Sequence, residues 1–135
     1  MQSRFLRDNV VCSSASLNSD VLREAVDYIN KQRYDVIFVG SDTVWDTRIN
    51  GGAPQPPNIY FLPDVECGVK VSLAASMDKG DPSFLPANRW RDCVNAIRSF
   101  DLITIRDHTT MEFLGEQGID ESSMSFMPDP TFLHD

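Results

Sequence analysis

Hydrophobic residues along this chain alternate between the spacing of amphipathic helices and the short continuous runs of buried strands. The first helical pattern covers residues 20–33, with an apolar face made by Val21, Leu22, Ala25, Val26 and Ile29. Ser19 or Asp20 is expected to cap this helix, because a short side-chain oxygen satisfies a backbone N–H that lacks a helical partner. The run DVIFV at 35–39 follows, and its β-branched residues are typical of a strand buried on both faces.

Three further runs predict strands, and two further patterns predict helices between them. The strand runs are VKVSLAAS at 69–76, LITI at 102–105 and a short segment at 125–127. One helix, over 87–99, has a core-facing stripe of Trp90, Cys93, Val94 and Ile97. The other helix covers 107–117, with Asp107 as its cap and Gly118 at its end. This alternation predicts an α/β domain with a mainly parallel sheet and helices on both faces.

Small and charged residues stand directly after three of the predicted strands. They are Gly40-Ser41-Asp42, Ala75-Ser76 and Arg106-Asp107. The ligand crevice of an open parallel α/β sheet lies at the carboxyl ends of its strands. We therefore expect these groups to meet at one rim of the sheet.

The composition narrows the class of protein. Apolar residues make up 41% of the chain and charged residues 24%, as in a soluble globular domain. A net charge of −8 disfavours nucleic acid and anionic membranes as partners. The sequence has three cysteines without a C-x-x-C pair, which favours a reducing compartment. It shows neither an export signal nor an apolar run of about 20 residues. We therefore expect a cytoplasmic protein. His108 and His134 do not cluster with the cysteines, so no metal site is expected.

Five segments in a fixed order resemble the polysaccharide pyruvyl transferase family. They are DVIFVGSDTVW, YFL, KVSLAAS, FDLITIRDHTTMEFL and MPDPTFL, and together they span most of residues 35–133. GSD-x-x-W is the most specific of these segments. Members of the family usually begin with a Gly- and Asn-containing strand, loop and helix, which this sequence does not show before residue 35.

The resemblance implies one Rossmann-like half of a GT-B-like enzyme of two domains. Such enzymes transfer an enolpyruvyl unit from phosphoenolpyruvate to two hydroxyl groups of a sugar, which makes a cyclic ketal. The implied donor is phosphoenolpyruvate, without a cofactor, and the implied acceptor is a glycan or a lipid-linked saccharide. Exopolysaccharide or cell-wall glycan synthesis is the process that this chemistry serves.

The resemblance also implies a division of the chain. Residues 1–34 are expected to form an N-terminal segment with one amphipathic helix, and residues 35–127 the α/β core. Residues 128–135 are expected to begin a linker to a second domain that is missing here. On this interpretation the isolated chain is inactive.

Each uncharged candidate at the rim has a functional and a structural interpretation. Gly40 and Ser41, together with Asp42, either line a substrate cleft or form an ordinary turn at the end of a strand. Trp45 either stacks on a sugar or packs in the core or against a second domain. Ser76 either allows a ligand to approach the backbone or is small because a helix crosses the sheet there.

The charged candidates also have both a functional and a structural interpretation. Arg106 is expected either to grip a carboxylate or phosphate, or to form an ion pair with Asp107 or Asp42. Asp107 is a substrate contact or, more simply, a helix cap. Asp42 and His108 are the candidates for acid–base chemistry, and Asp129 is expected to shape a hinge between domains.

Two other functions remain open from the sequence. One is a non-catalytic α/β module that binds a sugar or a nucleotide, and the other is a fragment of a GT-B-type glycosyltransferase. The sequence has no dense cluster of Arg and Lys for phosphoenolpyruvate. This scarcity agrees with a donor site that lies mostly in the missing domain.

Overall fold

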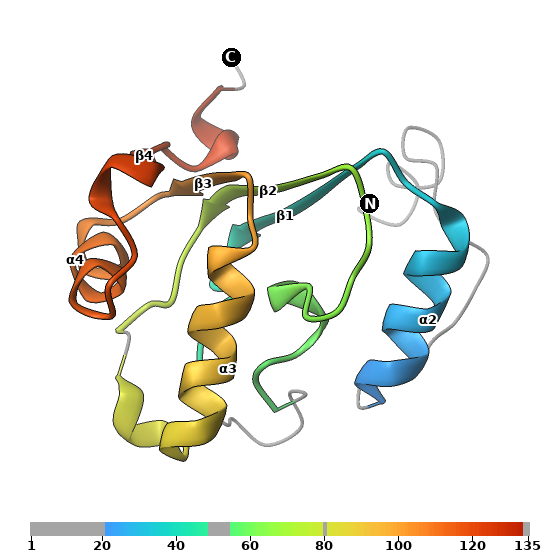
Figure 1. Ribbon diagram of the computed structural model, residues 1–135. Coiled ribbons are helices and arrows are strands. Elements are labelled where there is room, and N and C mark those ends of the chain that lie inside the picture. Colours follow the sequence, from blue (N-terminus) through green and yellow to red (C-terminus); the bar gives the residue numbers. More distant parts are fainter. Residues whose placement is uncertain (1–20, 49–54, 80, 134–135) are drawn as a thin grey trace, which may run out of the picture.

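The computed structural model describes residues 21–48, 55–79 and 81–133, which fold around a single four-stranded sheet (Figure 1). The strands are β1 (Val36–Asp42), β2 (Val69–Ala75), β3 (Leu102–Ile105) and β4 (Met124–Phe126). They lie side by side in chain order, and every neighbouring pair is parallel. The predicted α/β fold with a parallel sheet is confirmed. The finer likeness to a Rossmann-like half and the division into domains stay predictions.

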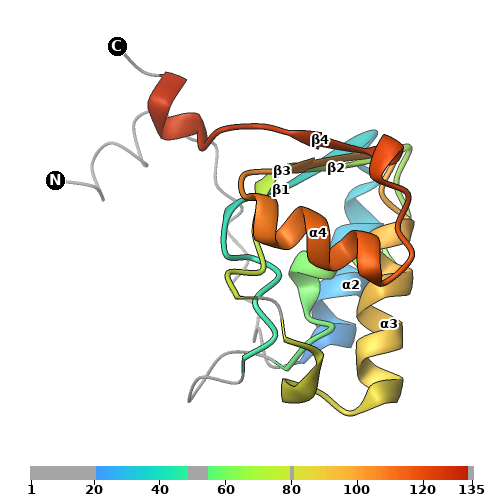
Figure 2. The same cartoon turned by 90° about the vertical axis from the view of Figure 1, so that its left-hand side faces the viewer.

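The described helices lie on one face of the sheet, and not on both faces as the sequence pattern predicted. They are α2 (Leu22–Gln32), α3 (Ala87–Arg98) and α4 (His108–Glu116). Figure 2 shows all three on the same side of the strands. For α3 and α4, which connect β2 to β3 and β3 to β4, the physical reason is the strand order: right-handed crossovers that step in the same direction place their helices on the same face. Helices reach the other face only where the strand order reverses.

The prediction for β1 also needs correction. The strand continues through Gly40 to Asp42, so the polar residues expected after the strand form its last part. Among the described residues β1 lies at the edge of the sheet, and its side chains are not buried on both faces. Val36 and Phe38 are 43% and 65% exposed on the face opposite the helices. A run of apolar residues cannot by itself distinguish a central strand from an edge strand.

The core fills the space between the sheet and the helices. The predicted stripe of α3 is confirmed, because all four of its residues are buried: Trp90, Cys93, Val94 and Ile97. Trp45 lies in the same cluster, with its ring 6.4 Å from that of Phe61 and 5.6 Å from that of Phe100. None of the helices in the described part of the chain is long and apolar enough to cross a membrane.

Helix ends and short turns complete the architecture. Val21 occupies the cap position of α2 without a side-chain hydrogen bond, whereas Ser19 and Asp20 lie outside the described residues. Asp107 caps α4, as predicted. The short 3-10 helices are η1 (Ile59–Phe61), η2 (Pro82–Phe84), η3 (Glu121–Ser123) and η4 (Pro130–Leu133). The last of these, η4, lies beyond the carboxyl ends of the strands (Figure 2).

Candidate functional site

Arg106 joins three segments at the carboxyl rim of the sheet. Its Nη2 donates to Asp42 Oδ1 at 2.9 Å, and its Nη1 donates to Asp129 Oδ2 at 2.7 Å. Asp42 ends β1, Arg106 follows β3, and Asp129 precedes η4. One guanidinium group thereby holds Asp42, which lies 64 positions before Arg106 in the chain, and Asp129, which lies 23 positions after it.

Backbone hydrogen bonds close the same rim. Ser76 N donates to Asp42 O at 3.0 Å, and Trp45 N donates to Ser76 O at 3.1 Å. Arg106 N donates to Ala75 O at 3.2 Å. The predicted meeting of the three strand ends is therefore confirmed, and it follows from their parallel direction.

The charge at this point is negative, because one guanidinium faces two carboxylates. The backbone N–H of Thr43 and then the bond from Arg106 hold the pKa of Asp42 below its ordinary value of 3.8. Hydrogen bonds from the backbone and hydroxyl of Thr131, and then from Arg106, lower the pKa of Asp129. Both carboxyl groups are therefore ionised at neutral pH, and they are suited to accept hydrogen bonds from hydroxyl groups.

Gly40 is required by the neighbouring strand. Its φ is +132°, a conformation that residues with a side chain rarely adopt. A Cβ at this position would overlap the backbone carbonyl of Leu73 in β2. Close approach of β2 therefore accounts for this glycine, for which the sequence had left open a substrate cleft or an ordinary turn. Ser41, the next residue of β1, is half-buried.

Trp45 lies in the core and not at a surface. Its side chain is fully buried, and its indole Nε1 donates to Tyr60 O at 3.1 Å. A ring in this position cannot stack on a sugar in this domain. The core interpretation of Trp45 is the one that the structure bears out, and the reason is that the loop after β1 folds back under the sheet.

Ser76 and Asp107 use their side chains inside the protein. Ser76 is 4% exposed, and its hydroxyl accepts a hydrogen bond from Asp78 N at 2.9 Å. Asp107 Oδ1 accepts from Thr110 N at 2.7 Å, and Asp107 Oδ2 accepts from Thr110 Oγ1 at 3.0 Å. The Thr110 hydroxyl also accepts from Met77 N at 2.9 Å. These contacts position the strand ends. The helix cap of Asp107 is confirmed, whereas substrate contacts of Ser76 and Asp107 stay predictions.

An open hollow of about 450 Å³ adjoins Arg106 and Asp129. It is lined by Arg106, Phe126, Pro128, Asp129, Thr131 and Phe132. The sequence interpretation missed Phe126, Thr131 and Phe132 as candidates. Their signal was available in MPDPTFL, where a turn motif carries a hydroxyl and an aromatic residue. His108 borders this region, because its ring stacks on that of Phe126.

A second arginine, which sequence reasoning also missed, links the loops after β1 and β2. Arg48 Nη2 donates to Asp46 Oδ2 at 2.6 Å and also forms an ion pair with Asp78. Arg48, like Arg106, is thus paired with two aspartates. Neither guanidinium is held ready as an isolated positive charge for a phosphate.

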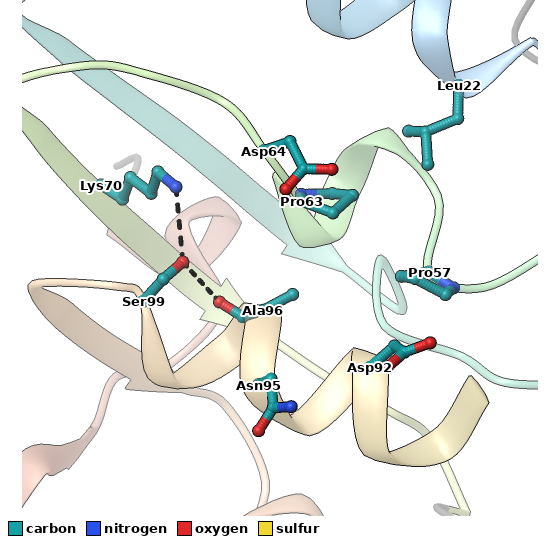
Figure 3. A pocket seen from close by; sticks show the side chains of 9 residues that line it. All are labelled: Leu22, Pro57, Pro63, Asp64, Lys70, Asp92, Asn95, Ala96 and Ser99. Atoms are coloured by element: carbon teal, nitrogen blue, oxygen red, sulfur yellow. Dashed lines mark hydrogen bonds between the residues drawn. The ribbon is translucent and has the colours of Figure 1, made fainter. Parts of the chain in front are cut away.

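Another hollow, of about 490 Å³, lies near the amino end of β2 (Figure 3). Its only described cation is Lys70, whose Nζ donates to Leu62 O and Ser99 Oγ at 3.4 Å each. Figure 3 shows the Lys70 side chain directed at Ser99, at the end of α3. Because ligands of open parallel sheets bind at the carboxyl ends of strands, we assign the candidate site to the rim around Arg106.

The titratable residues do not form a metal centre in the described part of the chain. No group of three or more His, Cys, Asp and Glu side chains comes together there. The rim itself offers two ionised carboxylates and one guanidinium that is paired with both, and this set is suited to recognition of hydroxyl groups.

Comparison with known protein families gives a match over most of the chain. A family model described as polysaccharide pyruvyl transferase matches residues 4–135. The search of curated proteins and the search of solved structures each gave no significant match. The family match covers the whole rim, including Asp42, Arg106 and Asp129.

Proposed function

Because the chain belongs to the polysaccharide pyruvyl transferase family, we propose that it forms the acceptor-binding half of an enzyme that transfers an enolpyruvyl unit from phosphoenolpyruvate to a sugar. The product is a cyclic ketal on a glycan or a lipid-linked saccharide. The donor is held largely by a second domain, so this chain alone is inactive. The reaction takes place in the cytoplasm and serves exopolysaccharide or cell-wall glycan synthesis.

The reaction sets requirements that the rim meets in part. The methylene carbon of the enolpyruvyl group gains a proton, and a first sugar hydroxyl adds to the adjacent carbon. Inorganic phosphate then leaves, and a second hydroxyl of the sugar bonds to the same carbon to close the ketal. The two hydroxyl protons balance the proton gained by the methylene carbon and the one carried away by phosphate. A base must take the hydroxyl proton, and cations must stabilise the departing phosphate. Asp42 is an exposed, ionised carboxylate and is our candidate for the group that accepts the hydroxyl proton or orients the hydroxyl.

Arg106 has a different role in this proposal. Two of its five N–H groups hold Asp42 and Asp129, and the others remain to donate to the carboxylate of phosphoenolpyruvate. His108 supplies acid–base chemistry beside it, as an exposed residue of the first turn of α4. The observation that carries the proposal is the contact between Asp42 and Arg106 at the rim of a chain from this family.

The decisive experiment measures phosphate release from phosphoenolpyruvate with a panel of saccharide acceptors. We expect release by the full product of the gene, and none by the 135-residue chain alone. No release by the full product with any acceptor would contradict the proposal. Thermal-shift measurements with phosphoenolpyruvate and with nucleotide sugars separate it from a GT-B glycosyltransferase, which would be stabilised by the nucleotide sugar.

Asp42→Asn is the sharpest variant for this assay. Asp42 has a φ of +82°, which Asn tolerates, so the substitution removes the charge with little strain on the backbone. We expect turnover to fall by about 10²–10⁴, the contribution of a general base. The melting temperature should fall only slightly, because the ion pair that Asp42 loses is exposed. Asp120→Asn, at the exposed cap of η3, is the matched control and should retain full turnover.

A non-catalytic sugar-binding module is the second candidate, because one observation favours it. Arg106 and Arg48 are each neutralised by two aspartates, so neither offers an uncompensated positive charge for a donor phosphate. Such a module would bind saccharides and leave phosphoenolpyruvate intact. The phosphate-release assay with the full gene product distinguishes it from the transferase.

A further inference from the structure

The rim carries two exposed aromatic rings that the groups discussed above do not explain. Phe126, the last residue of β4, is 51% exposed, and Phe132 in η4 is 82% exposed. Both line the hollow of about 450 Å³ beside Arg106. Apolar surface in water is unfavourable by about 25 cal/mol for each Å². Two such rings gathered in one hollow are typical of a surface that a ligand covers.

The ring of Phe126 is supported on one face by a second ring. The imidazole of His108 stacks on it, with the ring centroids 5.2 Å apart and the planes 12° from parallel. His108 begins α4, and the adjacent Asp107 fixes that end of the helix through its two bonds to Thr110. The exposed part of Phe126 is thus a supported apolar surface on the wall of the hollow.

Polar groups line the same hollow as the two rings. Arg106 has N–H groups beyond those that hold Asp42 and Asp129. Asp129 Oδ1 accepts from Thr131 N at 3.0 Å and from Thr131 Oγ1 at 2.9 Å. Since the Thr131 hydroxyl donates to Asp129, its lone pairs remain to accept from a ligand. The hollow therefore offers donors and acceptors beside apolar surface.

We propose that this hollow is the subsite for a pyranose ring of the saccharide acceptor, with Phe126 and Phe132 as its apolar walls. The inference rests on the proposed function and deepens it. A pyranose presents C–H groups on its faces and hydroxyl groups around its edge, which matches a lining that combines two aromatic rings with Arg106, Asp129 and Thr131. A volume of about 450 Å³ lies within the usual range of 300–1,000 Å³ for small-molecule sites.

The hollow lies beside the residues that we propose for the transfer reaction. Arg106 lines the hollow, and the same guanidinium holds Asp42. A sugar seated in the hollow therefore lies against the guanidinium that also holds the candidate base. This arrangement brings acceptor hydroxyls to the rim where the donor must arrive.

Saturation-transfer NMR on the 135-residue chain tests the subsite. The probes are the methyl pyranosides of glucose, galactose and mannose, together with N-acetylglucosamine and N-acetylmannosamine. We expect transfer to the ring C–H protons of at least one probe, with about tenfold weaker binding to Phe132→Ala. Phe38→Ala, which removes another exposed ring from the edge strand β1, should bind as the unmodified chain does.

A second variant protects the test against misfolding. Phe126→Leu keeps an apolar side chain of similar size but removes the ring, so we expect a native melting temperature and weakened saccharide binding. No transfer to any probe, or equal binding by Phe132→Ala and the unmodified chain, would overturn the subsite. If the gene product still releases phosphate in that case, only the subsite is wrong. If saccharides bind through Phe132 but phosphoenolpyruvate stays intact, the transferase proposal fails and the sugar site stands.

Discussion

Ser72 and Thr104 are bonded through their hydroxyl groups to each other's backbone across β2 and β3. Ser72 Oγ donates to Thr104 O at 3.1 Å and accepts from Thr104 N at 2.9 Å, and Thr104 Oγ1 donates to Ser72 O at 2.7 Å. The strand register shifts between Ser72 and Ala75, and Thr104 Oγ1 accepts from Ala74 N there at 2.9 Å. Two buried hydroxyl groups thus replace ladder bonds that the irregular strand loses. The irregularity immediately precedes Ser76 at the candidate site.

Thr104→Val should therefore destabilise the protein. Valine has nearly the same shape but cannot accept the bond from Ala74 N, and an unsatisfied buried donor costs about 1–3 kcal/mol. Urea denaturation measures the loss. The control is Thr109→Val on the exposed side of α4, which should change the free energy of unfolding by less than about 0.5 kcal/mol. Equal effects of the two substitutions would show that the buried hydroxyl is not important.

Gly40→Ala should also destabilise the protein, for a steric reason. The added methyl group would overlap the Leu73 carbonyl, and the φ of +132° is unfavourable for alanine, so we expect a cost above about 1 kcal/mol. Gly115→Ala is the matched control in α4, where the nearest side chain, that of Glu121, is free to move. Helix propensity there favours alanine by about 0.5–1 kcal/mol. Thermal unfolding should shift in opposite directions, and a stable Gly40→Ala would contradict the close approach of β2.

The Arg106 contacts predict a pH dependence at low pH. The folded-state pKa of Asp42 and Asp129 is lowered from 3.8, so their contribution to stability is present above that value and is lost as the pH falls through the folded pKa. Arg106→Gln should make the loss of stability below about pH 4 shallower. Carboxyl ¹³C NMR titration should show the pKa of Asp129 rising in this variant, but still lowered, because Thr131 continues to donate to it.

Asp120 provides an internal control in the same titration. Its pKa is lowered by hydrogen bonds from Ser122, without an arginine. The pKa of Asp120 should therefore be the same in the unmodified protein and in Arg106→Gln. An unchanged pKa of both Asp42 and Asp129 in the variant would contradict the ion pairs with Arg106.

The two described cysteines should differ in reactivity. Burial raises the pKa of the Cys93 thiol to about 12, whereas Cys67 is only half-buried. Because the thiolate is the reactive form, iodoacetamide at pH 8 should modify Cys67 in the native protein and leave Cys93 unmodified until denaturant is added. Peptide mass spectrometry measures both sites in one sample. Modification of Cys93 at the rate of Cys67 would show that the α3 stripe opens readily.

Much of the local structure could be predicted from the sequence. The spacing of Trp90, Cys93, Val94 and Ile97 predicted the buried face of α3, and Asp107 predicted the cap of α4. The parallel direction of the strands then predicted that Asp42, Ser76 and Arg106 would meet at one rim. These predictions succeeded because helix periodicity, capping and the direction of a crossover depend on short segments of chain.

The individual roles at the rim were decided by tertiary structure. The sequence could not show that Trp45 would turn into the core, or that Gly40 would face Leu73, because both depend on which strand lies beside β1. It also could not choose between one and two helix-covered faces, since that depends on whether the strand order reverses.

The sequence by itself determined the elements, the family and the edge of the sheet at which the polar residues gather. Tertiary structure decided that Arg106 is held by Asp42 and Asp129, and that Phe126 and Phe132 line a hollow beside it. The physical reason is the distance along the chain over which each interaction acts. Hydrophobic periodicity acts over a few residues, whereas an ion pair between positions 42 and 106 exists only after β1, β2 and β3 have paired in order.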